Sequence, residues 1–188
     1  MPIIEAHLLE GYNSEEKQRL AKGLTDAALM VIPAAPDAIT VMIHEMPQAN
    51  YMRGGSARTP APARSNPTQI IATYLAAMEA RELEVAQKML GEGFVMNFPD
   101  APGLTTLAEL IAWAKPRYKF VKKTYDKFEA FQNGPVSIVY SIGTLYGEWL
   151  DGSEFSGIRF IDRFEITDGK ITRQDVWNDM AEVKGKRA

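Results

Sequence analysis

The spacing of apolar residues changes several times along the chain, and these changes predict two units of different architecture. Residues 3–9 form a short, largely apolar run that favours a strand, and residues 39–46 form a second run of the same kind. Between them, apolar residues recur at helical spacing and define one face of a helix: Leu20, Leu24, Ala28 and Val31. The first unit is therefore predicted to be β-α-β.

The ends of this predicted helix carry their own signals. Asn13 or Ser14 can accept a hydrogen bond from the first turn, and two acidic residues follow where the helix dipole favours negative charge. Pro33 ends the helix because proline cannot donate the next backbone hydrogen bond. Two strands and one helix bury too little surface to be stable alone. We therefore expect this unit to pair with copies of itself or to pack on the second unit.

The second unit reads as α-α-β-α followed by long strands. An apolar stripe indicates a first helix, and shorter patterns indicate a second helix over 83–90, a strand over 94–98 and a third helix from Leu107. Four strands follow, near residues 119–131, 135–149, 154–166 and 170–179. The pairs Asp151-Gly152 and Asp168-Gly169 are typical of hairpin turns. Helices followed by an antiparallel meander predict an α+β fold, with the helices on one face of a curved sheet.

A stretch rich in glycine, proline and arginine lies between the two units. It reads RGGSARTPAPARSNP from residue 53 and contains no large apolar residue, which is typical of an exposed and fairly extended linker. The predicted organisation is a first domain over residues 1–55, a linker over 56–66 and a second domain over 67–188.

Composition restricts the chemistry. The chain has no cysteine, which excludes disulfides, thiol nucleophiles and thiolate metal sites, and its two histidines are too few for a histidine-rich metal centre. Carboxylates could still bind a hard cation. A net charge of −3 gives no general attraction to nucleic acid or to an anionic membrane, and no apolar run approaches the length of a membrane span. With no recognisable signal peptide, we expect a cytoplasmic protein without a cofactor or metal.

The order of motifs in residues 1–55 resembles the 4-oxalocrotonate tautomerase family. The resemblance is carried by MPIIEAHLLEG, by a helix that begins near Ser14, and then by ITVMIHEMP and NYMRGG. It implies that Met1 is removed and that Pro2 is the general base. A free amino-terminal proline is a secondary amine, and when neutral it can remove a proton alpha to a carbonyl. If Met1 stays, Pro2 is an amide and cannot be a base.

Two positions depart from this family's pattern. Where the family holds a dicarboxylate with arginines, this chain has Tyr12 and Thr40, so the resemblance does not carry over a dicarboxylate substrate. Tyr51 matches the aromatic residue that precedes the family's Gly-Gly. Arg53, two residues further on, is either a carboxylate ligand or a solvated linker arginine. The expected catalytic residues are Pro2, Tyr51 and Arg53, with Tyr12 as a further candidate.

Residues 66–182 resemble the SnoaL-like branch of the nuclear-transport-factor-like superfamily, which also contains ketosteroid isomerase. The resemblance is carried by TYLAAM in the first helix, by FIDRF at 160–164 and by DGKITRQDVWND at 168–179. It implies a cone in which a curved antiparallel sheet wraps over helices. Tyr74 and Asp162 match the oxyanion-hole tyrosine and protonated aspartate of the isomerase. The position of its general base falls near Phe98, which cannot accept a proton.

Three further residues of the second unit are candidates for a substrate pocket. Asp175 is either a catalytic acid or base, or a hydrogen-bonded structural carboxylate. Trp149 and Trp177 either line a pocket for an aromatic ligand or pack in the core. The sequence reasoning does not choose between these roles.

Three functions follow from these patterns. The first is a tautomerase or isomerase that acts on a small carbonyl compound with Pro2 as general base. The second places isomerase or cyclase chemistry in the C-terminal pocket and makes the first unit an oligomerisation element. The third is a ligand-binding protein without catalysis. In each case we expect a small-molecule partner, no nucleic acid, no membrane, and a homo-oligomer, either a dimer or a hexamer.

Overall fold

The computed structural model describes residues 2–185 as two compact units, and the boundary along the chain falls between Arg64 and Ser65. Met1, on whose removal the general-base hypothesis depends, lies outside the described residues. None of the helices in the described part of the chain is long and apolar enough to cross a bilayer.

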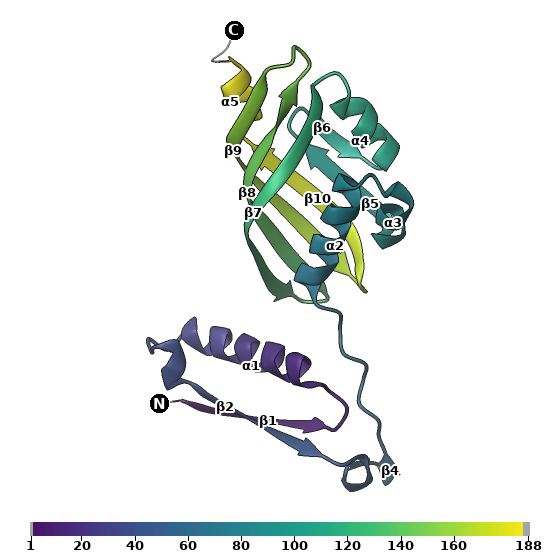
Figure 1. Cartoon of the computed structure of the whole chain (residues 1–188). Coiled ribbons are helices and arrows are strands. Elements are labelled where there is room, and N and C mark those ends of the chain that lie inside the picture. Colours follow the sequence, from purple (N-terminus) through teal and green to yellow (C-terminus); the bar gives the residue numbers. More distant parts are fainter. Residues whose placement is uncertain (1, 186–188) are drawn as a thin grey trace. The chain divides into compact units, whose positions relative to one another are not determined.

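The first unit is the expected β-α-β arrangement (Figure 1). Strands β1 (Ile3–Leu9) and β2 (Thr40–Met46) pair in parallel, and helix α1 (Ser14–Leu29) lies on one face of the pair. The remaining elements are short: η1 (Pro36–Ala38), η2 (Gln48–Asn50), and a hairpin of β3 (Met52–Arg53) and β4 (Ser56–Ala57).

Helix α1 begins as the sequence predicts but ends earlier. The Asn13 side chain accepts from the backbone N–H of Glu16, and the Glu16 carboxylate accepts in return from the backbone N–H of Asn13. This capping box satisfies two backbone donors that the first turn would otherwise leave unpaired. Val31, expected on the apolar face, lies past the end of the helix and is 83% exposed.

One face of the small sheet remains open within this unit. Lys17 of α1 pairs with Glu45 of β2 at 2.7 Å, so the alternate residues Val41, Ile43 and Glu45 face the helix. Met42 points to the opposite face, which no helix of the first unit covers (Figure 1). Ile39 is the one buried residue among those described in this unit. The unit thus lacks a closed core of its own, as its size led us to expect.

Much of the expected linker packs on the first unit. The Tyr12 hydroxyl donates to the carbonyl of Ala61 at 2.8 Å, and Arg19 donates to the carbonyl of Arg64 at 2.6 Å. Pro60 approaches Gly11 so closely that a Cβ at Gly11 would lie 2.9 Å from the proline ring. Residues 60–64 are therefore held in place, and the chain passes to the second unit after them.

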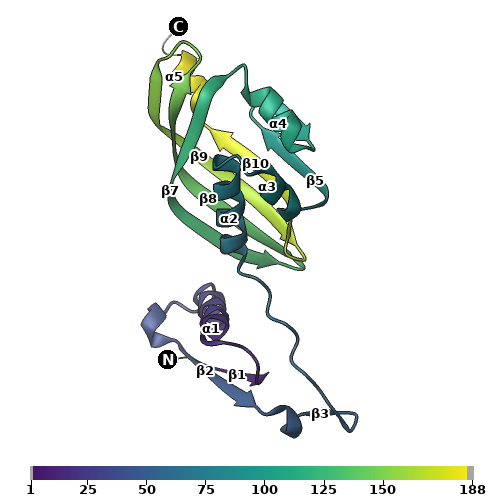
Figure 2. The ribbon, with the colours of Figure 1, turned by 45° about the vertical axis from the view of Figure 1, so that its right-hand side comes forward.

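The second unit is a curved six-stranded sheet with helices on its concave side (Figure 2). The strand order is β6-β5-β10-β9-β8-β7, antiparallel except between β10 and β5. The elements are α2 (Pro67–Glu79), α3 (Leu83–Met89), β5 (Leu90–Phe98), β6 (Ala101–Leu104), α4 (Leu107–Ala114), β7 (Tyr118–Asn133), β8 (Val136–Trp149), β9 (Glu154–Thr167), β10 (Lys170–Asn178) and α5 (Met180–Gly185).

This sheet and its helices enclose a core of two hydrophobic clusters. Ile71 and Tyr74 of α2 pack against Phe164 of β9, and all three are almost wholly buried. A second cluster, formed by Leu145, Trp149, Phe155, Ile158 and Phe160, fills the other end of the sheet. The α+β class and the four long strands are confirmed. Strand β6, the β3–β4 hairpin and α5 are elements that the sequence patterns did not predict.

Two glycines let β7 fold over the concave side. Gly143 and Gly147 of β8 lie next to register shifts in β7, where one extra residue is accommodated. A side chain at Gly143 would strike the carbonyl oxygen of Thr124, and one at Gly147 that of Phe120. The close approach bends the two strands, and inward-facing residues of β7 thereby become the wall of a cavity.

Candidate functional site

The first unit has a cavity of about 360 Å³ at the carboxyl ends of β1 and β2. Three of the expected catalytic residues line it together: Tyr12, Tyr51 and Arg53. The remaining lining residues are His7, Leu8, Leu9, Met46, Arg58, Thr59, Pro60 and Ala61. The cavity therefore combines an apolar floor from the strands with polar and cationic groups from the segments that follow them.

The charge of this cavity is positive. Arg53 and Arg58 both line it, and within residues 2–185 neither guanidinium makes an ion pair or a side-chain hydrogen bond. No acidic side chain is among the lining residues. A guanidinium presents several donors in a planar fork that matches a carboxylate, so the cavity suits a small anionic ligand. Arg58 was not singled out from the sequence because it lies in the segment read as linker.

Pro2 lies at the other end of the sheet. Its carbonyl accepts from the backbone N–H of Thr40 at 3.1 Å, which fixes it at the start of β1 beside the start of β2. The seven residues of β1 separate it from the cavity, a distance of roughly 20 Å. Within one chain, the structure thus brings Tyr12, Tyr51 and Arg53 together but leaves Pro2 apart from them.

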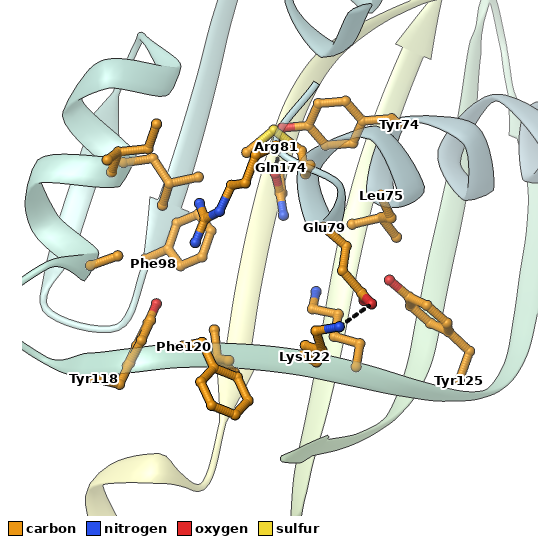
Figure 3. A pocket seen from close by; sticks show the side chains of 16 residues that line it. Tyr74, Leu75, Glu79, Arg81, Phe98, Tyr118, Phe120, Lys122, Tyr125 and Gln174 are labelled. Atoms are coloured by element: carbon orange, nitrogen blue, oxygen red, sulfur yellow. Dashed lines mark hydrogen bonds and ion pairs between the residues drawn. The ribbon is translucent and has the colours of Figure 1, made fainter. Parts of the chain in front are cut away.

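The second unit has a cavity of about 210 Å³ between α2, α4 and β7 (Figure 3). Aromatic rings form much of its wall, and Figure 3 shows Phe98, Tyr118 and Phe120 on one side, with Tyr125 further along β7. The other lining residues are Tyr74, Leu75, Met78, Glu79, Arg81, Leu110, Ile111, Ala114, Val121, Lys122, Lys123 and Gln174.

Tyr74 is at the inner end of this cavity, as the resemblance to the isomerase implied. It is 1% exposed, and its hydroxyl donates to Oε1 of Gln174 at 3.4 Å. Burial raises the pKa of Tyr74 well above its ordinary value, and the charge of Asp162 acts in the same direction. The phenol is therefore neutral at physiological pH and is able to donate a hydrogen bond.

Asp162 is wholly buried and forms an ion pair with Lys123 of β7. Burial raises the pKa of Asp162, while the ammonium of Lys123 acts to lower it. The Lys123 Nζ also lies 4.4 Å from the centre of the Phe160 ring. Sequence reasoning missed Lys123, although its place on β7 gives a signal, because it alternates with the partly buried Val121 and Tyr125 on the inward face.

The cavity lacks a free carboxylate at the position expected for an isomerase base. Phe98 lines the wall there, while Asp100 lies in a turn outside, with its side chain 94% exposed and 3.7 Å from Arg117. Glu79, the acidic residue that does line the cavity, pairs with Lys122 at 3.5 Å. Among residues 2–185 no three acidic or histidine side chains gather as ligands of a metal ion would.

Asp175 is held in a network outside this cavity. It accepts hydrogen bonds from Asn97 at 2.7 Å, from Arg163 at 3.1 Å and from Arg173 at 2.8 Å. Partial burial acts to raise the pKa of Asp175, but the hydrogen bonds from Arg173 and Asn97 outweigh it and hold the pKa below the ordinary value. These contacts favour the structural reading of Asp175.

The two candidate tryptophans do not meet Tyr74. Trp149 is 6% exposed and packs on Phe155, with ring centres 4.5 Å apart. Trp177 is 55% exposed and lies with Asp175 along a shallow depression beside β10. Of the five residues expected in the C-terminal pocket, Tyr74 alone lines the cavity. Asp162 is buried against Lys123, Trp149 packs on Phe155, and Asp175 and Trp177 lie together beside β10.

Comparison with known proteins identifies the first unit. Residues 2–58 match the tautomerase enzyme family. A "probable tautomerase" of Streptococcus pneumoniae is 37% identical over 59 residues, which are 31% of this chain and 98% of that protein. The chain belongs to the tautomerase family. A 2-hydroxymuconate tautomerase of Stutzerimonas stutzeri is 34% identical to this tautomerase over 55 residues, or 29% of this chain and 87% of its own.

The second unit of this tautomerase has a different relationship. An NTF2-like protein of unknown function from Burkholderia pseudomallei superposes with a TM-score of 0.54 and 18% sequence identity, over 64% of this chain and 95% of its own. This confirms the nuclear-transport-factor-like fold of the second unit. The protein is thus an isomerase of the tautomerase type whose second unit has the NTF2-like fold.

Proposed function

We propose that this tautomerase interconverts the keto and enol forms of a small carbonyl compound that carries a carboxylate, with Pro2 as general base after removal of Met1. The observation that carries the substrate class is the cavity at the carboxyl ends of β1 and β2, where Arg53 and Arg58 have no acidic neighbour in the lining. Family membership supports the reaction.

The proposed reaction moves one proton and leaves the composition of the substrate unchanged. In the direction from enol to ketone, the neutral Pro2 amine accepts the enol proton, and the resulting cation delivers a proton to carbon. Arg53 binds the carboxylate through charge-assisted hydrogen bonds, and Tyr51 packs against the body of the substrate. Tyr12 positions the wall of the cavity, because its hydroxyl donates to the carbonyl of Ala61.

The separation of Pro2 from Arg53 in one chain means that the proposed site is shared between copies. Pro2 of one copy would meet the arginine-lined end of the sheet of another. The open face of β1 and β2 supports such an assembly, since it exposes apolar residues that a partner copy would cover: Ile3 is 63% exposed. The proposal therefore includes a homo-oligomer as a condition for activity.

The experiment is ketonisation of phenylpyruvate enol by the full-length chain, with the mass of the intact protein measured to establish whether Met1 is absent. Replacement of the secondary amine in Pro2→Ala is expected to lower kcat/KM by about 10²- to 10⁴-fold, the usual contribution of a general base. Pro135→Ala is the matched control, since Pro135 lies between β7 and β8 in the second unit. Equal rates for wild type and Pro2→Ala would sink the proposal.

The contacts in the second unit favour binding over proton abstraction. Glu79, the carboxylate in the cavity wall, is paired with Lys122, and Phe98 occupies the position expected for an isomerase base. The proposed proton transfer is therefore placed in the first unit.

A further inference from the structure

The cationic residues of the C-terminal cavity are not equally compensated. Lys122 pairs with Glu79, and Lys123 pairs with the buried carboxylate of Asp162. The third cation that lines the cavity is Arg81. Within residues 2–185 its guanidinium makes neither an ion pair nor a side-chain hydrogen bond. The cavity therefore carries one positive charge without a counterion.

The backbone places this arginine at an unusual position. Arg81 follows the last residues of α2 and has a φ of 62°, in the left-handed region that normally selects glycine after a helix. A residue other than glycine pays an energetic cost there, and such strain often accompanies a functional role. The turn directs the side chain into the cavity, where Figure 3 shows the guanidinium beside Phe98.

The electrostatics of the wall agree with this placement. Burial raises the pKa of Tyr118, whose hydroxyl points toward the same part of the cavity, while the nearby Arg117 and Arg81 act to lower it (Figure 3). The positive charge of Arg81 is therefore felt inside the cavity. Arg81 is exposed to solvent, so an anionic group bound next to it would be compensated where the cavity opens to water.

The remaining wall is flat and largely apolar. Phe98 and Tyr118 present rings near Arg81, the ring of Phe120 points to the other side of β7, and Leu75 and Ile111 add aliphatic surface. Aromatic and aliphatic surfaces of this kind accommodate a planar apolar body, while a small number of polar groups fix its orientation. A volume of about 210 Å³ limits that body to roughly one ring with a short substituent.

We propose that the C-terminal cavity binds a small aromatic monocarboxylate, with its carboxylate on Arg81 and its ring between Phe98 and Tyr118. One uncompensated cation selects a single negative charge, and the guanidinium fork suits a carboxylate. The ligand site is separate from the proposed tautomerase site, and it stands whether or not Pro2 is a base.

Isothermal titration of the full-length chain with trans-cinnamate tests this site. Cinnamate is flat, has one carboxylate and has no acidic C–H alpha to its carbonyl, so the proposed tautomerase site cannot turn it over. Cinnamamide has nearly the same shape without the charge. Cinnamate is expected to bind more tightly than cinnamamide by roughly ten- to a hundredfold, the usual difference for hydrogen bonds to a charged group. Equal affinities, or no binding of cinnamate, would overturn the proposal.

Variants assign the site. Arg81→Gln is expected to remove the preference for cinnamate over cinnamamide, while the control Arg159→Gln keeps it, because Arg159 pairs with Asp179 outside the cavity. Ile111→Trp should block both probes by filling the cavity, which gives a second test if Arg81→Gln folds poorly. Arg53→Gln should remove any cinnamate binding in the first unit and leave the Arg81-dependent binding unchanged. If Arg53→Gln abolishes binding and Arg81→Gln does not, the ligand is in the first unit and the proposal is wrong.

Discussion

The two units of this tautomerase bury their residues in opposite ways. In the first unit one described residue, Ile39, is buried, and a face of its sheet stays open. In the second unit, helices cover the concave side of the sheet and enclose side chains such as Tyr74 and Phe164. One chain thus contains a unit with little buried core and a unit whose core is closed.

The cavities of the two units differ in a similar way. The C-terminal cavity is built from α2, α4 and β7 of a single unit, and its ion pairs are made within that unit. The N-terminal cavity collects Arg53 and Tyr51 at one end of the sheet, while Pro2 lies at the other. Under the proposed function, assembly of copies brings Pro2 to the Arg53 end of another sheet, so the oligomeric state is the sharpest test of the comparison.

The largest effect is expected from a charge on the open face of the first unit. Met42→Asp places a carboxylate where a partner copy should pack, and burying it unpaired would be strongly unfavourable. We expect loss of the oligomer by light scattering and at least about a 100-fold fall in phenylpyruvate ketonisation, because Pro2 would lose its partner site.

Val85→Asp is the matched control for this charge. Val85 is 44% exposed on α3 of the second unit, so a carboxylate there stays in water and should change neither oligomer nor rate. A Met42→Asp variant that stays assembled and fully active would contradict the proposal that a partner copy covers the open face of the first unit.

Sequence patterns predicted most of the fold because its signals are local and repeated. The alternation in β9 and the Asp168-Gly169 turn predict the hairpin of β9 and β10, and both turn residues have the positive φ that such turns need, 49° and 74°. Strand β6 was missed because four residues, APGL, include a proline and a glycine and show no alternation. It becomes a strand through pairing with β5, which local pattern cannot reveal.

The sites were predicted less completely for a related reason. Tyr12, Tyr51 and Arg53, all expected catalytic residues, line one cavity, and Arg58 joins them through the fold of the segment that was predicted to be a linker. In the second unit, Lys123 pairs with Asp162 across 39 positions of sequence. No local sequence pattern predicts the position of Arg58 in the cavity or the pairing of Lys123 with Asp162. Both depend on how distant segments pack.

A smaller effect is expected from the ionic network around Asp175, and it tests whether the charge of Asp175 stabilises the second unit. Asp175 has a lowered pKa, so its charged form stabilises the fold above the ordinary value near 3.8, and that stability is lost as pH falls through the lowered pKa. Asp175→Asn should cost about 1–3 kcal/mol in the free energy of unfolding from pH 5 to 8. The difference from wild type should shrink below about pH 4.

Urea titrations across this pH range measure that difference, with Asp126→Asn as a control on the exposed side of β7. The control should stay within about 0.5 kcal/mol of wild type at every pH. A cost for Asp175→Asn that does not diminish in acid would mean that its charge is not what stabilises the network.

The smallest effect is expected from removing the capping box at the start of one helix in each unit. Asn13 begins α1 and Thr106 begins α4, and each forms a capping box with an acidic residue three positions later. Alanine at either position should cost about 1 kcal/mol. All three tryptophans lie in the second unit, so tryptophan fluorescence reports the unfolding of that unit. Thr106→Ala should lower the urea midpoint measured by fluorescence. Asn13→Ala should lower the midpoint measured by circular dichroism and leave the fluorescence midpoint unchanged. Because a unit completed by partners gains stability by mass action, the Asn13→Ala midpoint should rise with protein concentration while the Thr106→Ala midpoint stays constant. Concentration-independent midpoints for both would show that the first unit is stable without its partners.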